Sequence, residues 1–272
     1  MSGVTISFVV PAYNEEALIA SCLHAILAET ARVNCASEII VVDNNSTDRT
    51  REIASALPAV AVVDEPQRGL VQARRAGCRA ARGELVANID ADTMIPPGWL
   101  DTVLAMFARH PDLAALSGPF VHYDLSRKAQ VTAAIFYRFA FVSYLLVRFV
   151  FRAGSMMQGG NFVVRKSAIE AAKAFDSNFS FYGEDTELAR RLSKVGAVKF
   201  SFALPAFSSG RRLVAEGMFH VAFQYSINYL WTLLFKQPFT LDWLDFRHSN
   251  EAAENRPSLA SAGSSPGKPP AS

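Results

Sequence analysis

Short β-branched segments alternate with longer alanine-rich segments over residues 6–121, and this alternation restricts the fold more than any other feature. The β-branched segments have the length of strands, and each is followed by polar residues or glycine. The segments between them have the apolar spacing of helices. This pattern predicts an α/β fold with a mostly parallel central sheet wrapped by helices. The expected strands are residues 6–10, 38–42, 60–63, 85–89 and 114–121.

The first helix is expected to begin directly after the first strand. Asn14 is a favourable N-cap residue, and Glu15 and Glu16 would then occupy the first turn. Negative charge in that turn interacts favourably with the helix dipole. We therefore predict a helix N-terminus at Asn14.

Composition and charge narrow the class of protein. Of the 272 residues, 50% are hydrophobic and 19% charged, as in a compact domain with a substantial core. A formal net charge of +2 argues against a nucleic-acid partner. Cys22, Cys35 and Cys78 form no CxxC pair and no metal-ligand spacing, so we expect a reducing, cytoplasmic environment. The apolar stretch before Pro11 is too short for a signal peptide, and export is not expected.

Aromatic and apolar residues crowd two later stretches, 131–151 and 218–235. Each has a narrow polar edge at helical spacing. Each stretch therefore predicts either a core helix with one solvent-exposed polar edge or a helix lying in a membrane interface. A crossing by residues 131–151 is disfavoured, because each arginine in the bilayer centre costs about 2.5–3.5 kcal/mol. The polar edges comprise Arg127, Gln130, Arg138, Arg148 and Arg152 in the first stretch and His220, Gln224, Asn228, Thr232 and Lys236 in the second.

Three aspartates follow predicted strands. Asp43 follows residues 38–42, and Asp90 and Asp92 follow residues 85–89, so all three would lie at the carboxyl edge of a parallel sheet, the usual ligand crevice of open α/β folds. The alternate spacing in Asp90-Ala91-Asp92 offers two carboxylates as hard oxygen ligands for Mg²⁺ or Mn²⁺. An isolated Asp-x-Asp can equally be a solvated turn.

No phosphate-loop, GxGxxG or GxSxG motif is present, which argues against P-loop nucleotidases, dinucleotide dehydrogenases and α/β-hydrolases.

Five motifs occur in a fixed order along the chain. They are Pro11-Ala12-Tyr13-Asn14-Glu15-Glu16, residues 41–48, residues 69–77 with Arg74, Asp90-Ala91-Asp92 and Gly183-Glu184-Asp185. Together they resemble the family 2 glycosyltransferases, which have a GT-A fold and invert the anomeric centre. The resemblance covers about residues 6–217, and it implies a nucleotide-sugar-binding half at 1–125 and an acceptor-shaping half with amphipathic helices at 126–247. Composition predicts that the tail at 248–272 is disordered.

The resemblance implies a set of donor-binding residues. The turn containing Pro11, Ala12, Tyr13 and Glu15 would bracket the base and ribose, and Asp43 would accept a hydrogen bond from the base. Arg74 would neutralise the donor phosphate, although a solvated basic face would also explain this residue. Asp90 and Ala91 would approach the ribose or sugar, and Asp92 would bind the divalent metal. His220 would be a further metal contact, or simply a polar edge position on its helix.

The resemblance also implies which residues lie on the acceptor side of the site. Asp185 would be the general base that takes the proton of the acceptor hydroxyl, and an inverting transfer needs only one such carboxylate. Its alternative role is to stabilise a helix N-terminus, where Glu184 and Glu187 also lie. The other expected acceptor-side residues are Gly159, Gly160, Asn161, Glu184, Arg211 and Arg212.

The function expected from this resemblance is a metal-dependent, inverting transfer of sugar from a UDP- or GDP-sugar to an acceptor hydroxyl. The acceptor would be a sugar, a glycan or a lipid-linked molecule. Because residues 131–151 lie between Asp92 and Asp185, which would share one site, we expect that helix to lie flat on the inner face of a membrane and hold a cytoplasmic enzyme there peripherally. Two alternatives stay open: a silent nucleotide-sugar-binding subunit of a membrane assembly and, with less support because the first loop is acidic, a nucleotidyltransferase.

Overall fold

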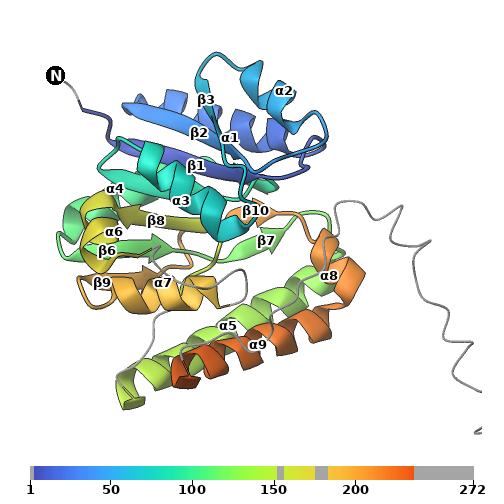
Figure 1. Cartoon of the computed structure of the whole chain (residues 1–272). Coiled ribbons are helices and arrows are strands. Elements are labelled where there is room, and N and C mark those ends of the chain that lie inside the picture. Colours follow the sequence, from blue (N-terminus) through green and yellow to red (C-terminus); the bar gives the residue numbers. More distant parts are fainter. Residues whose placement is uncertain (1–2, 152–155, 175–182, 236–272) are drawn as a thin grey trace, which may run out of the picture.

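A seven-stranded sheet forms the centre of the computed structural model, which describes residues 3–151, 156–174 and 183–235 (Figure 1). Its strand order is β3-β2-β1-β4-β8-β6-β9. The first four of these are parallel, β8 runs antiparallel to both neighbours, and β9 is parallel to β6. The predicted α/β fold with a mostly parallel sheet is confirmed. The strands are β1 Ile6–Ala12, β2 Ser37–Asp43, β3 Val60–Asp64, β4 Leu85–Ile89, β6 Leu113–Ser117, β8 Asn161–Arg165 and β9 Ala197–Phe200.

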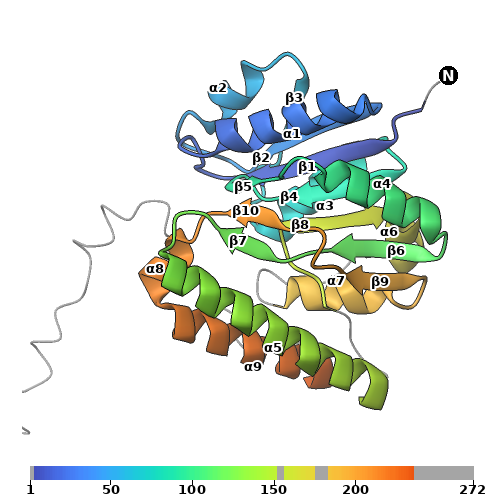
Figure 2. The ribbon, with the colours of Figure 1, turned by 180° about the vertical axis from the view of Figure 1, so that it is seen from behind.

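Helices cover both faces of this sheet, because its strands alternate apolar side chains between the two. Phe8 and Val10 of β1 pack in the core beneath α1 and α4, while Val9 belongs to the core on the opposite face, beneath α3, α6 and α7. Figures 1 and 2 show these layers from their two sides. The helices are α1 Ile19–Val33, α2 Thr50–Ser55, α3 Leu70–Ala80, α4 Trp99–Arg109, α6 Lys166–Ala172 and α7 Glu184–Leu192.

The strand expected at 114–121 is two strands in two sheets. β6 ends at Ser117, and β7 (Phe120–His122) joins β5 (Thr93–Met94) and β10 (Ala206–Ser208) in a three-stranded sheet of order β5-β10-β7. The chain changes sheet at Gly118, where a Cβ atom would overlap the backbone carbonyl of Leu204. The prediction of one strand was wrong because periodicity alone does not reveal this close backbone approach.

The predicted helix start at Asn14 was also wrong. Asn14 lies in the left-handed region, at φ 50°, and Glu15 begins a turn in which its carbonyl accepts hydrogen bonds from the N–H groups of Leu18 and Ile19. The helix α1 begins only at Ile19. Asn14 and Glu15 are instead held by the loop that follows β2, which leaves them in the crevice at the sheet edge.

Two long helices lie side by side beyond α7, as both ribbon views show (Figures 1 and 2). They are α5 (Arg127–Phe151) and α9 (Met218–Phe235), and the short helix α8 (Arg211–Glu216) leads into α9. Both apolar stretches of the sequence are therefore helical, as predicted. Within the ranges that the structure describes, neither these helices nor any other is long and apolar enough to cross a membrane. Arg152, Lys236 and the tail 248–272 lie outside those ranges.

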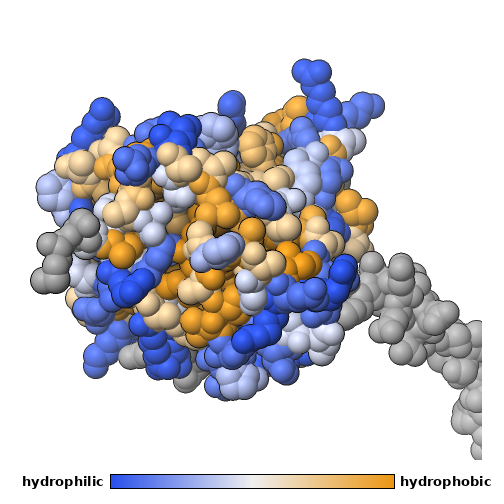
Figure 3. Space-filling model, turned by 90° about the horizontal axis from the view of Figure 1, so that it is seen from above, coloured by the Kyte–Doolittle hydropathy of each residue, from blue (hydrophilic) through white to orange (hydrophobic). Residues whose placement is uncertain are grey.

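The helix α5 has a buried residue and an exposed apolar side. Ala133 is buried, whereas Val131, Ile135 and Val142 expose 53%, 62% and 55% of their surface. Arg138 is also exposed and lies on the same side of the helix, at spacings of three and four residues from Ile135 and Val142. On the face seen from above in Figure 1, apolar side chains lie near the centre and polar and charged side chains lie around them (Figure 3).

Candidate active site

The predicted site residues converge at the carboxyl ends of β1, β2 and β4. Pro11 and Ala12 are the last two residues of β1, and Ala12 lies in register with Asp43, the last residue of β2. Asp90 directly follows β4, which pairs with β1 on its other side. The sheet therefore brings together residues that are up to 80 positions apart in the sequence. Ala91 is buried among the core residues beneath α1 and α4, so its role is packing.

The turn after β1 is fastened to the loop after β2. The Asn14 side-chain oxygen accepts a hydrogen bond from the Thr47 N–H at 2.8 Å, and the Glu15 N–H donates to the Thr50 hydroxyl at 2.7 Å. The carboxylate of Asp43 accepts a hydrogen bond from the Ser46 N–H at 3.2 Å. These bonds give Asp43 and the turn a fixed relative position, which a planar ligand bound between them would require.

Two residues of this crevice were not predicted. The Arg68 guanidinium carbon lies 3.6 Å from the centre of the Tyr13 ring, a stacked cation–π arrangement. Asn44 donates hydrogen bonds to the carbonyls of Glu65 and Gln67 and accepts one from the Gly69 N–H, all at 2.8 Å. The only sequence signals were the position of Arg68 just before the motif at residues 69–77 and the place of Asn44 within the motif at 41–48.

Arg74 lies at the centre of a buried ionic cluster. Its side chain is 1% exposed, and its two terminal nitrogens form ion pairs with the carboxylates of Glu184 and Asp90, the latter at 3.0 Å. The helix α3 thus meets the N-terminus of α7 and the end of β4 at one guanidinium. Burial raises the pKa of Glu184, and the charge of Arg74 opposes that rise. The structure places Arg74 among carboxylates rather than on an open phosphate site.

Asp185 stands in the first turn of α7, as the sequence predicts, and Gly183 is the N-cap in the left-handed conformation. Its carboxylate accepts a hydrogen bond from the Thr186 N–H at 2.8 Å. Burial raises its pKa above the usual value, while Arg74 and the Gly159 N–H moderate the rise. Asp185 forms no ion pair with any residue that the structure describes. It is thus a carboxylate of raised pKa that is held by backbone N–H groups and pairs with no cation of the described residues.

Asp92 belongs to a second ionic group. Arg211, at the start of α8, bonds to the carboxylate of Glu15 and lies 3.3 Å from that of Asp92. Burial raises the pKa of Asp92 to about 7, and the nearby charges of Asp90 and Glu15 add to the rise. Three carboxylates and one arginine leave this corner of the site with surplus negative charge.

That surplus fits a divalent cation held with its substrate. Among the described residues, no three His, Cys, Asp or Glu side chains form a complete metal site. Mg²⁺ and similar ions are commonly held by one or two carboxylates, with phosphate oxygens and water completing the coordination. Asp92, with Asp90 two residues before it, suits that arrangement, in which a bound diphosphate supplies further oxygens.

The turn before β8 closes the site beside Asp90. The Asp90 N–H donates to the Gly160 carbonyl at 3.2 Å, and Gly160 has a φ of +80° that favours glycine. Gly159 lies against Arg74 and Asp185. Asn161 is fully buried, and its amide bonds to Trp99 at 3.1 Å and to the Leu204 carbonyl at 2.9 Å. The side chain of Asn161 therefore serves packing, and the acceptor-side role expected for residues 159–161 stays a prediction.

The remaining predicted residues lie on α8 and α9. Arg212 pairs with Glu216 one turn later, at 2.9 Å. His220 is exposed, and its ring bonds to Gln224 at 2.9 Å. Within the described ranges His220 joins no cluster of metal-ligating side chains. Its predicted metal contact therefore receives no support from the geometry.

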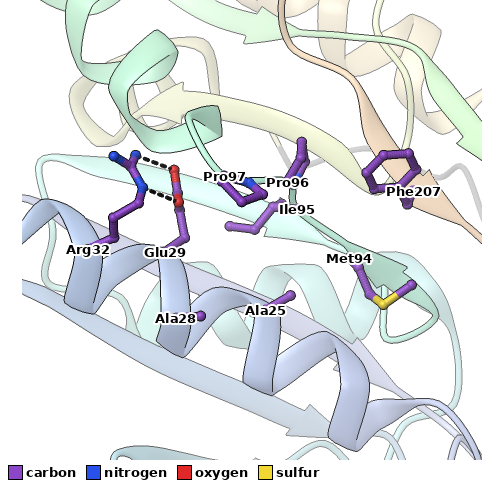
Figure 4. A pocket seen from close by; sticks show the side chains of 9 residues that line it. All are labelled: Ala25, Ala28, Glu29, Arg32, Met94, Ile95, Pro96, Pro97 and Phe207. Carbon is purple, nitrogen blue, oxygen red and sulfur yellow. Dashed lines mark hydrogen bonds and ion pairs between the residues drawn. The ribbon is translucent and has the colours of Figure 1, made fainter.

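A pocket of about 380 Å³ lies apart from these carboxylates, between α1 and the segment after Asp92 (Figure 4). Its lining is largely apolar, and the Glu29–Arg32 pair stands at one end. None of the predicted site residues lines it. The lining residues are Ala25, Ala28, Glu29, Arg32, Met94, Ile95, Pro96, Pro97 and Phe207.

Comparison with known sequences agrees with this arrangement of carboxylates at the sheet edge. A model of glycosyl transferase family 2 matches residues 7–172, more than half of the chain. The chain belongs to glycosyltransferase family 2. The match covers the crevice at the ends of β1, β2 and β4, and the Asp185-bearing helix follows it.

Curated relatives that are named as glycosyltransferases or sugar transferases match part of the chain. An undecaprenyl-phosphate 4-deoxy-4-formamido-L-arabinose transferase of Pseudomonas aeruginosa is 37% identical over 114 residues, covering 40% of this chain and 34% of the relative. Glycosyltransferase AglE of Haloferax volcanii is 32% identical over 101 residues, covering 35% and 33%. The chain spans about a third to a half of the length of such relatives.

Solved structures confirm the GT-A fold. Glucosyl-3-phosphoglycerate synthase from Mycobacterium tuberculosis, solved with Mn²⁺ and UDP-glucose, superposes with a TM-score of 0.56 at 21% identity, covering 85% of this chain and 79% of that chain. The mannosyltransferase PcManGT from Pyrobaculum calidifontis, solved with GDP-mannose and Mn²⁺, also gives 0.56 at 21% identity, covering 84% and 65%.

Proposed function

We propose that this family 2 protein is an inverting glycosyltransferase that moves a sugar from a UDP- or GDP-sugar to an acceptor hydroxyl. The observation that carries the proposal is the placement of Asp185, a half-buried carboxylate of raised pKa without an ion-pair partner among the described residues, beside Gly159 and the Arg74 that pairs with Asp90. Family membership and the nucleotide sugars bound in two structures of the same fold support the donor class.

Asp185 acts as the general base. It takes the proton of the acceptor hydroxyl while that oxygen attacks the anomeric carbon and the bond from this carbon to the diphosphate breaks. Glu184 is less suited to this role, because it is 4% exposed and its carboxylate is paired with Arg74. A raised pKa makes the Asp185 carboxylate a stronger base.

The donor lies along the crevice from β2 to β4. The base stacks near Tyr13 and bonds to Asp43, and the diphosphate lies near Asp92. Asp92 would hold a divalent ion, Mn²⁺ or Mg²⁺, which when bound would neutralise charge on the leaving nucleoside diphosphate. Asp92 with its neighbouring carboxylates provides the negative site for that ion.

Transfer assays with a panel of UDP- and GDP-sugars, with and without Mn²⁺ or Mg²⁺, test this function directly. We expect transfer or donor hydrolysis that EDTA abolishes. Full activity in EDTA would contradict the role of the metal. Calorimetric binding of a nucleotide sugar without any turnover would instead favour a silent binding subunit.

We further propose a lipid-linked acceptor and a peripheral position on the inner, cytoplasmic face of a membrane. The exposed row of Val131, Ile135 and Val142 on α5, with Arg138 among them, supports contact with an anionic lipid surface. The name of the Pseudomonas relative supports a lipid phosphate as acceptor.

Flotation with vesicles containing anionic lipid tests the membrane contact. We expect wild-type protein to float at low salt, and Ile135→Glu with Arg138→Glu to reduce flotation while leaving donor binding intact. Equal recovery with neutral and anionic vesicles, or no recovery with either, would contradict this position.

A further inference from the structure

A single buried guanidinium joins three separate parts of the site. Arg74 is the second largest side chain among those less than 2% exposed, and its guanidinium carbon also lies 5.5 Å from the Phe162 ring centre. Its terminal nitrogens meet Glu184 on α7 and Asp90 after β4. A Cβ placed on Gly159 would lie 3.5 and 3.6 Å from those same nitrogens. The turn at 159–160 thus packs directly on this guanidinium.

The contacts of Arg74 leave it unsuited to bind a phosphate. Each terminal nitrogen already has a carboxylate partner, and the side chain has 1% of its surface exposed. A phosphate that took the place of Asp90 or Glu184 would leave a buried carboxylate without its counter-ion, which is strongly unfavourable. The cation therefore serves the protein's own carboxylates.

The cluster needs the positive charge of Arg74 because three carboxylates lie close together. Asp90, Glu184 and Asp185 approach one another closely enough for their charges to raise the pKa of Glu184, and Arg74 is the cation that opposes the rise. Without it, three carboxylates at the junction of β4 and α7 would repel one another. The first turn of α7, which carries Asp185, would then lose its anchor to the donor side.

We infer that Arg74 is a positioning residue that fixes the distance between the donor-binding loop at Asp90 and the base Asp185 through its two ion pairs. This inference rests on the proposed function for its catalytic consequence, but the anchoring itself does not depend on turnover. It replaces the direct phosphate contact expected from the sequence. The Arg74 guanidinium thus sets the position of the donor relative to the base Asp185.

Steady-state kinetics separate positioning from phosphate binding. For Arg74→Gln we expect kcat to fall about 100-fold, as for a misplacement near 1 Å, with the donor KM within about threefold of wild type. Arg74→Lys keeps the charge and should recover part of kcat. Arg79→Gln is the matched control, since Arg79 is exposed on the same helix and should behave as wild type. A large rise in donor KM with unchanged kcat would overturn the inference.

Hydrogen exchange tests the anchoring independently of activity. In folded Arg74→Gln we expect faster amide exchange in residues 90–94 and 184–188 and unchanged exchange in α1. If Arg74→Gln does not fold, Arg74→Gln combined with Glu184→Gln removes both charges of the buried pair, and we expect it to fold with kcat still low. Recovery of wild-type kcat in the double variant, or unchanged exchange, would overturn the inference. If the wild-type protein shows no transfer, the proposed function is contradicted. The hydrogen-exchange result then still tests whether Arg74 anchors the first turn of α7.

Discussion

Gly160→Ala should damage both stability and catalysis, for a reason visible in the backbone. Gly160 has a φ of +80°, and a Cβ built there would overlap the Asp90 carboxylate. Left-handed backbone costs an alanine about 1–2 kcal/mol. The carboxylate must also move away from Arg74, which sacrifices a charge-assisted hydrogen bond worth about 1.5–3 kcal/mol. We therefore expect the free energy of unfolding to fall by about 2.5–5 kcal/mol.

Urea unfolding followed by tryptophan fluorescence measures this loss, and Gly159→Ala is the matched control. A Cβ at Gly159 meets its nearest atoms at 3.5 Å or more, which is ordinary contact, and its φ is not positive. That variant should remain within about 1 kcal/mol of wild type. In the fraction of Gly160→Ala that stays folded, kcat should fall about 100-fold because Asp90 is displaced. Equal stability of the two variants would refute the close approach of Gly160 to Asp90.

Three further outcomes follow from the ionic groups. Glu29→Gln should lower the free energy of unfolding at pH 7 by about 1–3 kcal/mol in urea titrations, since the buried Glu29 carboxylate accepts N–H bonds at the start of α4. The hydrogen bond from Arg32 lowers the pKa of Glu29 in the folded protein. The ionised Glu29 carboxylate therefore stabilises the fold fully above the unfolded pKa of about 4.3, and this stabilisation is lost as pH falls through the folded pKa. The difference in unfolding free energy between variant and wild type should thus shrink below about pH 4. Asp92→Ala should abolish metal-dependent transfer, and residual activity above a few per cent would remove Asp92 from the metal site. Arg211→Gln removes a positive charge beside Asp92, an effect of about 1 kcal/mol on the binding of a cation. In EPR titrations without donor, we therefore expect the affinity for Mn²⁺ to rise about fivefold. Arg212→Gln is the control and should leave this affinity unchanged.

The strands and the location of the site could be predicted because they depend on local pattern. Residues 85–89 form β4 with the predicted bounds, and the runs ending before Asp43 and Asp90 are strands of one parallel sheet. Strand periodicity and polar punctuation are properties of neighbouring residues. The rule that parallel strands end at one edge then brings Asp43 and Asp90 together without further information.

The partners of the charged residues could not be predicted in this way. Asn14 followed by two glutamates has the local pattern of a helix start, yet hydrogen bonds from the loop after β2 hold it in a turn. Arg74 has the same sequence setting as the neighbouring Arg75 and Arg79, and only the tertiary fold buries it between two carboxylates. Such contacts join residues 16 to 110 positions apart, whose distance no local pattern encodes.

The arginine partners explain why similar carboxylates would have different roles. Glu184 and Asp90 share Arg74, and Glu15 and Asp92 share Arg211, so each of these four groups is held in place by a cation. Protonation of a carboxylate held in this way would break its ion pair, which opposes the rise in pKa that burial causes in Glu184 and Asp92. Asp185 has a raised pKa and no ion pair among the described residues. A proton from an acceptor hydroxyl can therefore be taken up by Asp185 without breaking an ion pair, which is why this carboxylate beside Arg74 is the one expected to act as the base.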